Sequence, residues 1–200
     1  MPTDSGRSTK LEDTGFIVLS DEAMGWDDIQ VSVSSARLPA SSAPNWTTYD
    51  FGIAGGVAFN VLGYSVNEYQ DIYIQTSHAM ALQTILDNHI HWTIPSDSAG
   101  SKFKFQLDVI AAGIGEMFAA VAGSPFTPEK TLAGDESGRH NLFDLAEIPG
   151  VNTTVSTCYI MRMKRIAASS GEYGSPVYVI FNDSHYKSDT PAGSRAEDSK

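Results

Sequence analysis

The sequence predicts an all-β protein, an antiparallel β-sandwich with extended N- and C-terminal arms, for which a jelly roll is the favoured topology. Short stretches of alternating apolar and polar residues recur along the chain, and no long stretch shows a helical period. Glycine, serine and threonine are frequent between these stretches. The pattern predicts about eight to ten strands, and an immunoglobulin-like sandwich is the alternative because periodicity leaves the strand order open.

The clearest strand is expected at residues 102–109, where Phe103, Phe105, Leu107 and Val109 alternate with polar side chains. Further strands are expected at 26–33, 46–51, 57–64, 68–75, 87–95, 139–148, 153–166 and 177–186. Residues 77–86 are expected to form a loop with at most one or two helical turns. Residues 111–116 are expected to interrupt a strand, and residues 123–138 to form a long exposed loop.

The chain divides into an N-terminal arm at 1–24, a sandwich domain at 25–187 and a C-terminal tail at 188–200, because both ends are polar. The arm contains one apolar patch, formed by Phe16, Ile17, Val18 and Leu19. An extended apolar segment of this kind can add a strand to the edge of another sheet. We therefore predict that these four residues bind a partner.

The charge of the chain is acidic, with a net value of −11 and a pI near 4.7. Nucleic-acid binding needs clustered lysine and arginine, so we expect no nucleic-acid partner and allow docking on a basic protein surface. The densest basic cluster is Arg162, Lys164 and Arg165. We interpret it as a solvated strand end, with binding of an acidic partner as the alternative.

The single cysteine, Cys158, lies in an apolar run and is expected to be a buried structural thiol, since one cysteine makes no intrachain disulfide. The chain has no run of about 18 apolar residues, the length needed to span a membrane, so no membrane partner is expected. The polar residues Met1–Lys10 lack the apolar core of a signal peptide. We expect the protein to stay in the cytoplasm until it assembles.

The most informative motif is His89-Ile90-His91-Trp92 within the strand expected at 87–95. The two histidines are two residues apart, so they share one face of the strand. With His185 they could form a metal site of the cupin type, although the expected glutamate is missing after His91. The favoured interpretation is packing against a neighbouring strand or subunit, with no metal and no cofactor.

Motifs for covalent catalysis are also missing. The chain has no Gly-x-Ser-x-Gly element, and Asp27 and Asp28 are adjacent, so on a strand they point to opposite faces. Gly113-Ile114-Gly115 lacks the strand-to-helix setting of a phosphate loop. We therefore expect a protein that is not an enzyme.

In several short motifs, in order and spacing, the chain resembles a family of tailed-bacteriophage virion structural proteins. The resemblance covers about residues 26–195, and Lys187 stands where the family usually has an acidic residue. The matching elements are Trp26-Asp27-Asp28-Ile29, Arg37-Leu38-Pro39, Pro44-Asn45-Trp46, His78, His89-Ile90-His91-Trp92, Ala112-Gly113-Ile114-Gly115-Glu116, Ala146-Glu147-Ile148-Pro149-Gly150, Met161-Arg162, His185-Tyr186-Lys187-Ser188-Asp189-Thr190 and Gly193-Ser194-Arg195.

The resemblance implies a virion component. The favoured hypothesis is a capsid decoration or cement protein, assembled in the host cytoplasm, that binds the major capsid protein on the head surface as homotrimers. A tail, head-fibre or adsorption protein of the same fold is the alternative. A cupin-like metal-binding enzyme that uses His89, His91 and His185 is more remote.

Overall fold

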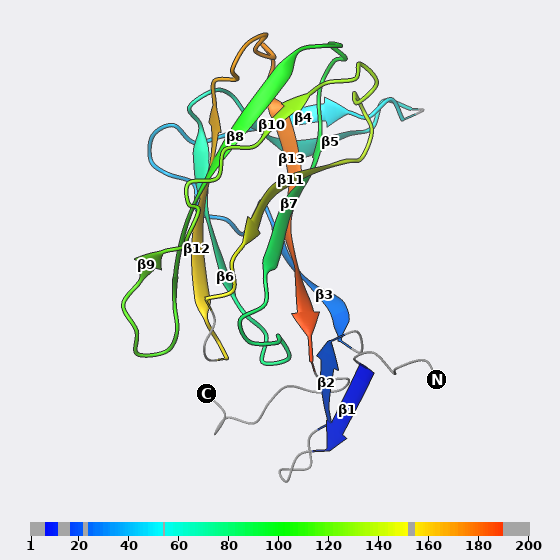
Figure 1. Cartoon of the computed structure of the whole chain (residues 1–200). Coiled ribbons are helices and arrows are strands. Elements are labelled where there is room, and N and C mark those ends of the chain that lie inside the picture. The colour runs from blue at the N-terminus through cyan, green and yellow to red at the C-terminus, as the bar shows by residue number, and fades with distance from the viewer. Residues whose placement is uncertain (1–6, 12–16, 22–23, 54, 152–154, 190–200) are drawn as a thin grey trace.

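The structure is a computed structural model that describes residues 7–11, 17–21, 24–53, 55–151 and 155–189. These residues form strands and no helix (Figure 1). The strands are β1 (Arg7–Leu11), β2 (Ile17–Asp21), β3 (Gly25–Ser32), β4 (Asn45–Asp50), β5 (Ala58–Tyr64), β6 (Tyr69–Gln75), β7 (Leu86–Thr93), β8 (Lys102–Ala112), β9 (Ala119–Ala120), β10 (Glu129–Thr131), β11 (Asn141–Ile148), β12 (Cys158–Ile166) and β13 (Val177–Ser188). Within these described ranges, no helix is long and apolar enough to cross a membrane.

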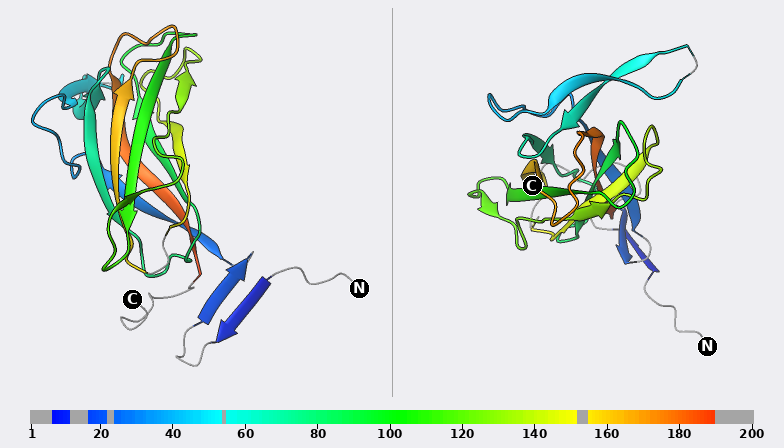
Figure 2. Two further views of the ribbon diagram at one scale, coloured as in Figure 1. Left: turned by 60° about the vertical axis from the view of Figure 1, so that its left-hand side comes forward. Right: turned by 90° about the horizontal axis from the view of Figure 1, so that it is seen from above.

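Two antiparallel sheets pack face to face (Figures 1 and 2). One contains the order β3-β13-β7-β11 and the other the order β6-β12-β8-β10. In chain order, the first group consists of β3, β7, β11 and β13. The second group consists of β6, β8, β10 and β12. This is the strand order of a jelly roll, so the predicted topology is confirmed and the immunoglobulin-like alternative is wrong.

The core lies between the sheets and follows the predicted alternation. In β8 the side chains of Phe103, Phe105, Leu107 and Val109 are fully buried, while the polar residues between them are partly exposed. Across the sandwich, the Trp92 ring of β7 lies 4.8 Å from the Phe103 ring in an edge-to-face contact. Aromatic side chains therefore join the two sheets at the centre of the molecule.

The segment at 123–138 differs from the predicted exposed loop. Its residues Glu129–Thr131 form β10, which pairs with β8, and Leu132 is buried. Glu136 is also buried, because its carboxylate accepts backbone N–H groups of Ala133, Gly134 and Asp135. The turn thus satisfies its own polar groups and closes one end of the sandwich.

Two strand ends also differ from prediction. Of the strand expected at 153–166, residues 153–154 lie outside the described residues, and the strand begins at Cys158, since Ser156 has a φ of 64° and lies in a turn. Conversely, β8 continues through Ala112, past the expected interruption at 111. Cys158 is half-buried rather than buried, and burial raises the pKa of its thiol.

Only part of the predicted solvated basic cluster lies on the surface, since Arg162 and Lys164 share the outer face of β12 and Arg165 does not. Arg165 is buried, and its guanidinium donates to the carbonyl oxygens of Tyr64 and Ser175 and to the Glu172 carboxylate. Arg162 points outward and forms a two-pronged ion pair with Asp71. Alternation along β12 separates the two arginines onto opposite faces, because they are three residues apart.

In the described part of the N-terminal arm, β1 pairs with β2 as a separate hairpin at one end of the sandwich (Figure 2). Of the predicted partner-binding patch, Ile17, Val18 and Leu19 lie in β2, and Phe16 lies outside the described residues. The Leu19 backbone N–H donates to the Asp189 carbonyl oxygen at 2.6 Å. The backbone of Ile17, Val18 and Leu19 therefore pairs within its own chain, and binding of the patch to a neighbour stays a prediction.

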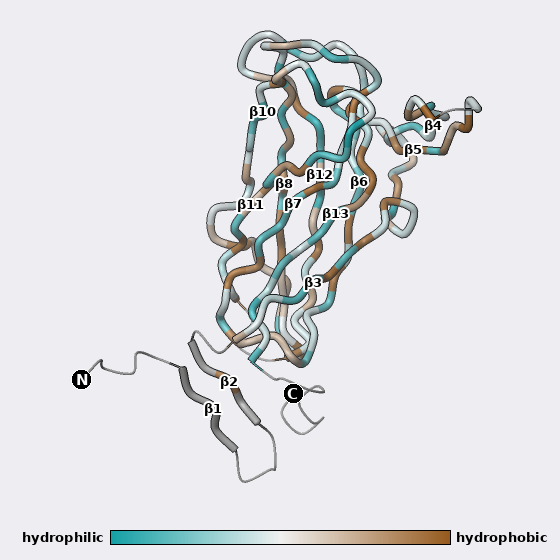
Figure 3. Tube along the Cα trace, turned by 90° about the vertical axis from the view of Figure 1, so that its right-hand side faces the viewer, coloured by the Kyte–Doolittle hydropathy of each residue, from teal (hydrophilic) through white to brown (hydrophobic). Residues whose placement is uncertain are grey.

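A second hairpin, β4–β5, projects from the other end of the sandwich (Figure 2). Its inner strand β5 pairs with Val177–Val179 of β13, and β3 pairs with the following stretch, Phe181–Ser188. β5 and β3 thus share one edge of β13 in succession. The rest of the hairpin extends beyond that edge, and it carries apolar residues along its length (Figure 3).

Candidate functional site

Strand β7 places its two histidines on the outer face of the first sheet. His89 and His91 point away from the core, whereas Ile90 and Trp92 are fully buried between the sheets. The predicted sharing of a face is therefore confirmed. The outward direction means that the histidines lie on the surface of the sandwich and not in its interior.

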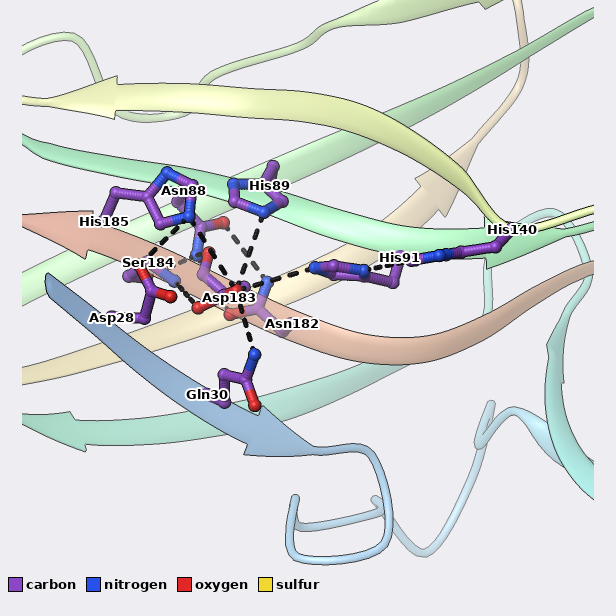
Figure 4. Close-up of polar contacts among 10 residues, drawn as sticks. All are labelled: Asp28, Gln30, Asn88, His89, His91, His140, Asn182, Asp183, Ser184 and His185. Carbon is purple, nitrogen blue, oxygen red and sulfur yellow. Dashed lines mark hydrogen bonds and ion pairs between the residues drawn. The ribbon is translucent and has the colours of Figure 1, made fainter. Parts of the chain in front are cut away.

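Strand β13 brings a second pair of polar side chains to the same face. Asp183 lies opposite His89 in the antiparallel register, and His185, two residues later, lies opposite Asp28 of β3. Because residues two apart on a strand share a face, Asp183 and His185 both lie beside the β7 histidines. The cluster therefore combines His89, His91, His185 and Asp183 from the two central strands (Figure 4).

The Asp183 carboxylate is the centre of this histidine–aspartate cluster. Its Oδ2 lies 3.5 Å from His91 Nε2, 3.7 Å from His89 Nε2 and 4.0 Å from His185 Nε2. His185 Nε2 also lies 3.1 Å from Asp28 Oδ1. Three imidazole nitrogens therefore converge on one carboxylate oxygen (Figure 4).

Burial makes this carboxylate unusual for an outer face. Asp183 is only 2% exposed, and His89 only 4%. Asp183 Oδ1 accepts the backbone N–H of Ser184, and Gln30 Nε2 approaches Oδ2 at 3.5 Å. Among the described residues, no lysine or arginine pairs with it. Burying a carboxylate with no lysine or arginine beside it costs free energy. The imidazoles around Asp183, alone or together with a bound ligand, are the groups placed to offset this cost.

A fourth histidine extends the cluster along β7. His140 precedes β11, and its Nε2 lies 2.6 Å from His91 Nδ1, with the two rings stacked at 18°. Burial, then the neighbouring His89 and His140, lower the pKa of His91, and the Asp183 carboxylate opposes this only in part. His91 is therefore neutral near pH 7. Its Nε2 is buried and has no hydrogen-bond partner.

Directly behind the cluster, the inner face of the same strands carries buried amides. Asn88 and Asn182 donate to each other at 2.9 and 3.2 Å, and Asn88 also donates to the Ser184 hydroxyl at 2.8 Å. All three residues are buried. This network holds β7 and β13 in one register and so positions the histidines and Asp183 that alternate with it.

Of the residues that the sequence singled out, the structure brings His89, His91 and His185 together. Sequence reasoning missed Asp183 and His140. The sequence does hold one signal for Asp183, an Asp183-x-His185 pattern on the last strand that has the same spacing as His89-x-His91. This pattern indicates a shared site only once β13 is known to pair with β7. The cupin-like arrangement is not found, because the cluster faces outward while Ile90, Trp92 and Phe103 fill the space between the sheets.

Comparisons with known proteins add little. No family model matches the chain, and no curated protein matches it. A solved structure described as that of infectious bursal disease virus, Gx strain, is similar over 92% of this chain, with 10% sequence identity and a TM-score of 0.30. The chain spans 41% of the length of that chain. A match at this TM-score carries no argument about function, so the proposals below depend on the chain itself.

Proposed function

We propose that the protein is a virion structural protein, a capsid decoration or cement protein of a tailed bacteriophage that binds the head surface as homotrimers. The resemblance over residues 26–195 supports the virion role, and the jelly-roll fold agrees with it. A fold alone does not define a function. The proposal therefore also depends on exposed apolar side chains that a neighbouring molecule would cover.

That feature is the β4–β5 hairpin, the observation that carries the proposal. Four of its large apolar side chains are about half exposed: Trp46 at 48%, Ile53 at 47%, Val57 at 50% and Phe59 at 51%. The hairpin projects from the sandwich (Figures 2 and 3), and about half of each of these four side chains is exposed. Large apolar side chains that are exposed in this way are typical of protein–protein interfaces.

A groove lies at the base of the same hairpin. It has a volume of about 410 Å³ and is lined by Trp46 and Phe59 of the hairpin and by Val33 and Phe181 of the sandwich. A head-to-tail contact, in which this surface of one copy meets a different surface of the next, closes into a ring when the rotation fits. We propose that a second copy of the chain covers this surface in the trimer.

The partner of the assembled trimer is the major capsid protein. The net charge of −11 favours a basic docking surface and does not favour nucleic acid. The mechanism is mechanical: hairpins and arms bridge neighbouring capsid subunits, and many small contacts oppose the pressure of the packaged DNA. This role requires no catalysis.

Native mass spectrometry of the purified full chain tests the trimer. A mass of three subunits supports the proposal, and a monomer or dimer at micromolar concentration overturns it. Electron microscopy of virions labelled with an antibody against the chain tests its location. Label on the head supports the decoration role, and label confined to the tail overturns it in favour of a tail or adsorption protein.

A further inference from the structure

We propose that His89, His91, His185 and Asp183 bind one divalent transition-metal ion, best matched by Zn²⁺, on the outer face of β7 and β13. The inference concerns side chains of one chain and stands whether or not the chain is a virion protein. Imidazole nitrogens with one carboxylate are the ligands of Zn²⁺ and related ions, whereas Ca²⁺ and Mg²⁺ prefer oxygen ligands.

The distances fit a coordination sphere. Zinc–nitrogen and zinc–oxygen bonds of about 2.0–2.2 Å place neighbouring tetrahedral ligand atoms roughly 3.4 Å apart. Ligand atoms of His89, His91 and Asp183 all lie within 4.8 Å of one another, and Asp183 Oδ2 is 3.5 and 3.7 Å from the two imidazole Nε2 atoms. These three residues form the core of the site.

His185 supplies the fourth ligand. Its Nε2 is 4.0 Å from Asp183 Oδ2, and its ring centroid is 4.6 Å from that of His89. The same Nε2 pairs with Asp28 at 3.1 Å, so binding the ion exchanges this exposed contact for a metal bond. The His185 side chain is 39% exposed and can move more easily than the other ligands.

The buried negative charge of the cluster also favours binding of a cation. Among the residues that the structure describes, only imidazoles and no lysine or arginine lie in ion-pair range of the buried Asp183 carboxylate. A metal ion compensates the carboxylate while all imidazoles stay neutral, which is the form that coordinates. The His91 Nε2 atom is buried without a hydrogen-bond partner and lies 3.5 Å from Asp183 Oδ2, so it is placed to coordinate an ion next to that oxygen.

Contacts with residues outside the four proposed ligands orient the ligand side chains for metal binding. His91 Nδ1 is engaged by His140 at 2.6 Å, which leaves Nε2 for the ion. The Ser184 backbone N–H holds Asp183 Oδ1 at 2.8 Å, which leaves Oδ2 for the ion. Such second contacts fix ring orientation and tautomer in metal sites. The bound ion would cross-link the two central strands of the sheet.

The experiment uses the full chain without a histidine tag, stripped of metal with a chelator. Zn²⁺ alone is titrated by calorimetry with a competing chelator, and Co²⁺ is added separately to record its visible absorption. We expect one Zn²⁺ per chain and the intense d–d bands of four-coordinate Co²⁺. Less than stoichiometric Zn²⁺ binding, or a Co²⁺ spectrum of the hydrated ion, overturns the proposal.

Variants identify the ligands. Asp183→Asn and His91→Ala should weaken Zn²⁺ binding by more than about 100-fold, and the outer-contact variant His140→Ala by about 10-fold. His185→Ala changes the most exposed ligand, keeps the fold, and should weaken binding and alter the Co²⁺ bands. His78→Gln, which removes a histidine outside the cluster, is the matched control and should bind normally. Equal weakening in His78→Gln, or normal binding in His185→Ala and His91→Ala, overturns the assignment.

Discussion

Asn88 and Asn182 face each other in the core and exchange two side-chain hydrogen bonds, at 2.9 and 3.2 Å. They sit on the two central strands, one residue from His89 and Asp183 respectively. Alternation therefore places an amide pair on the inner face and the histidine–aspartate cluster on the outer face of the same short stretch. Both features join β7 to β13, one by amide hydrogen bonds and the other by the approach of His89 Nε2 to Asp183 Oδ2 at 3.7 Å.

The amide pair leads to a stability prediction. Asn88→Ala should lower the free energy of unfolding by about 2–3 kcal/mol, because it leaves the buried Asn182 amide without its partner. Urea unfolding measures the change. Gln75→Ala, at an exposed position of β6, is the control and should stay within about 0.5 kcal/mol of the parent. An Asn88→Ala variant as stable as Gln75→Ala would contradict the proposed role.

The two arginines of β12 should differ sharply. Arg165→Ala removes a buried guanidinium and leaves the carbonyl oxygens of Tyr64 and Ser175 without donors, so we expect a loss of about 3–5 kcal/mol. Arg162→Ala breaks a partly exposed pair with Asp71 and should cost no more than about 1 kcal/mol. Thermal and urea unfolding of both variants measure the difference. A similar loss of unfolding free energy in both variants would show that burial does not determine how much each arginine of β12 contributes to stability.

Acid stability should depend on Glu129. The Ser169 hydroxyl and backbone N–H, followed by Lys102, hold the pKa of this carboxyl at about 2. Because the folded-state pKa lies below the unfolded value near 4.5, the contribution is complete above pH 4.5 and is lost as the pH falls toward 2. Carbon-detected NMR titration should locate the midpoint.

The matched variants for this prediction are Glu129→Gln and Glu147→Gln. Glu129→Gln should flatten the fall in stability between pH 4.5 and 2, while Glu147→Gln removes an exposed carboxylate of β11 for comparison. Ser169→Ala should raise the Glu129 pKa, since one donor to the charged form is lost. An unchanged pH profile in Glu129→Gln would refute the assignment.

The apolar hairpin should control assembly. Replacing Trp46 and Phe59 by serine removes two half-exposed rings without touching the buried core, so the fold should remain and the trimer should dissociate to monomers. Native mass spectrometry and circular dichroism measure the two properties. Met117→Ser, which changes a side chain that is 91% exposed elsewhere, is the control. Trimers that persist in the double variant would place the interface on another surface.

Much of the fold could be predicted because its strands are half-buried. In 102–109, alternating Phe103, Phe105 and Leu107 with polar neighbours predicts both the strand and its buried face, since a period of two is the geometry of a pleated strand. Residues 123–138 were not predictable in this way. Their glycines and charges indicate an exposed loop, yet Glu136 turns inward onto backbone N–H groups that only the closed turn presents.

The sequence by itself determined the class of fold, the shared face of His89 and His91, and the acidic charge that disfavours nucleic acid, because local periodicity and composition are properties of the chain alone. The tertiary structure decided the rest. Whether Arg165 is buried, and whether Asp183 meets His89, depends on which strands become neighbours. Strand pairing joins residues nearly a hundred positions apart, and that choice is made by packing of the two sheets rather than by any local pattern.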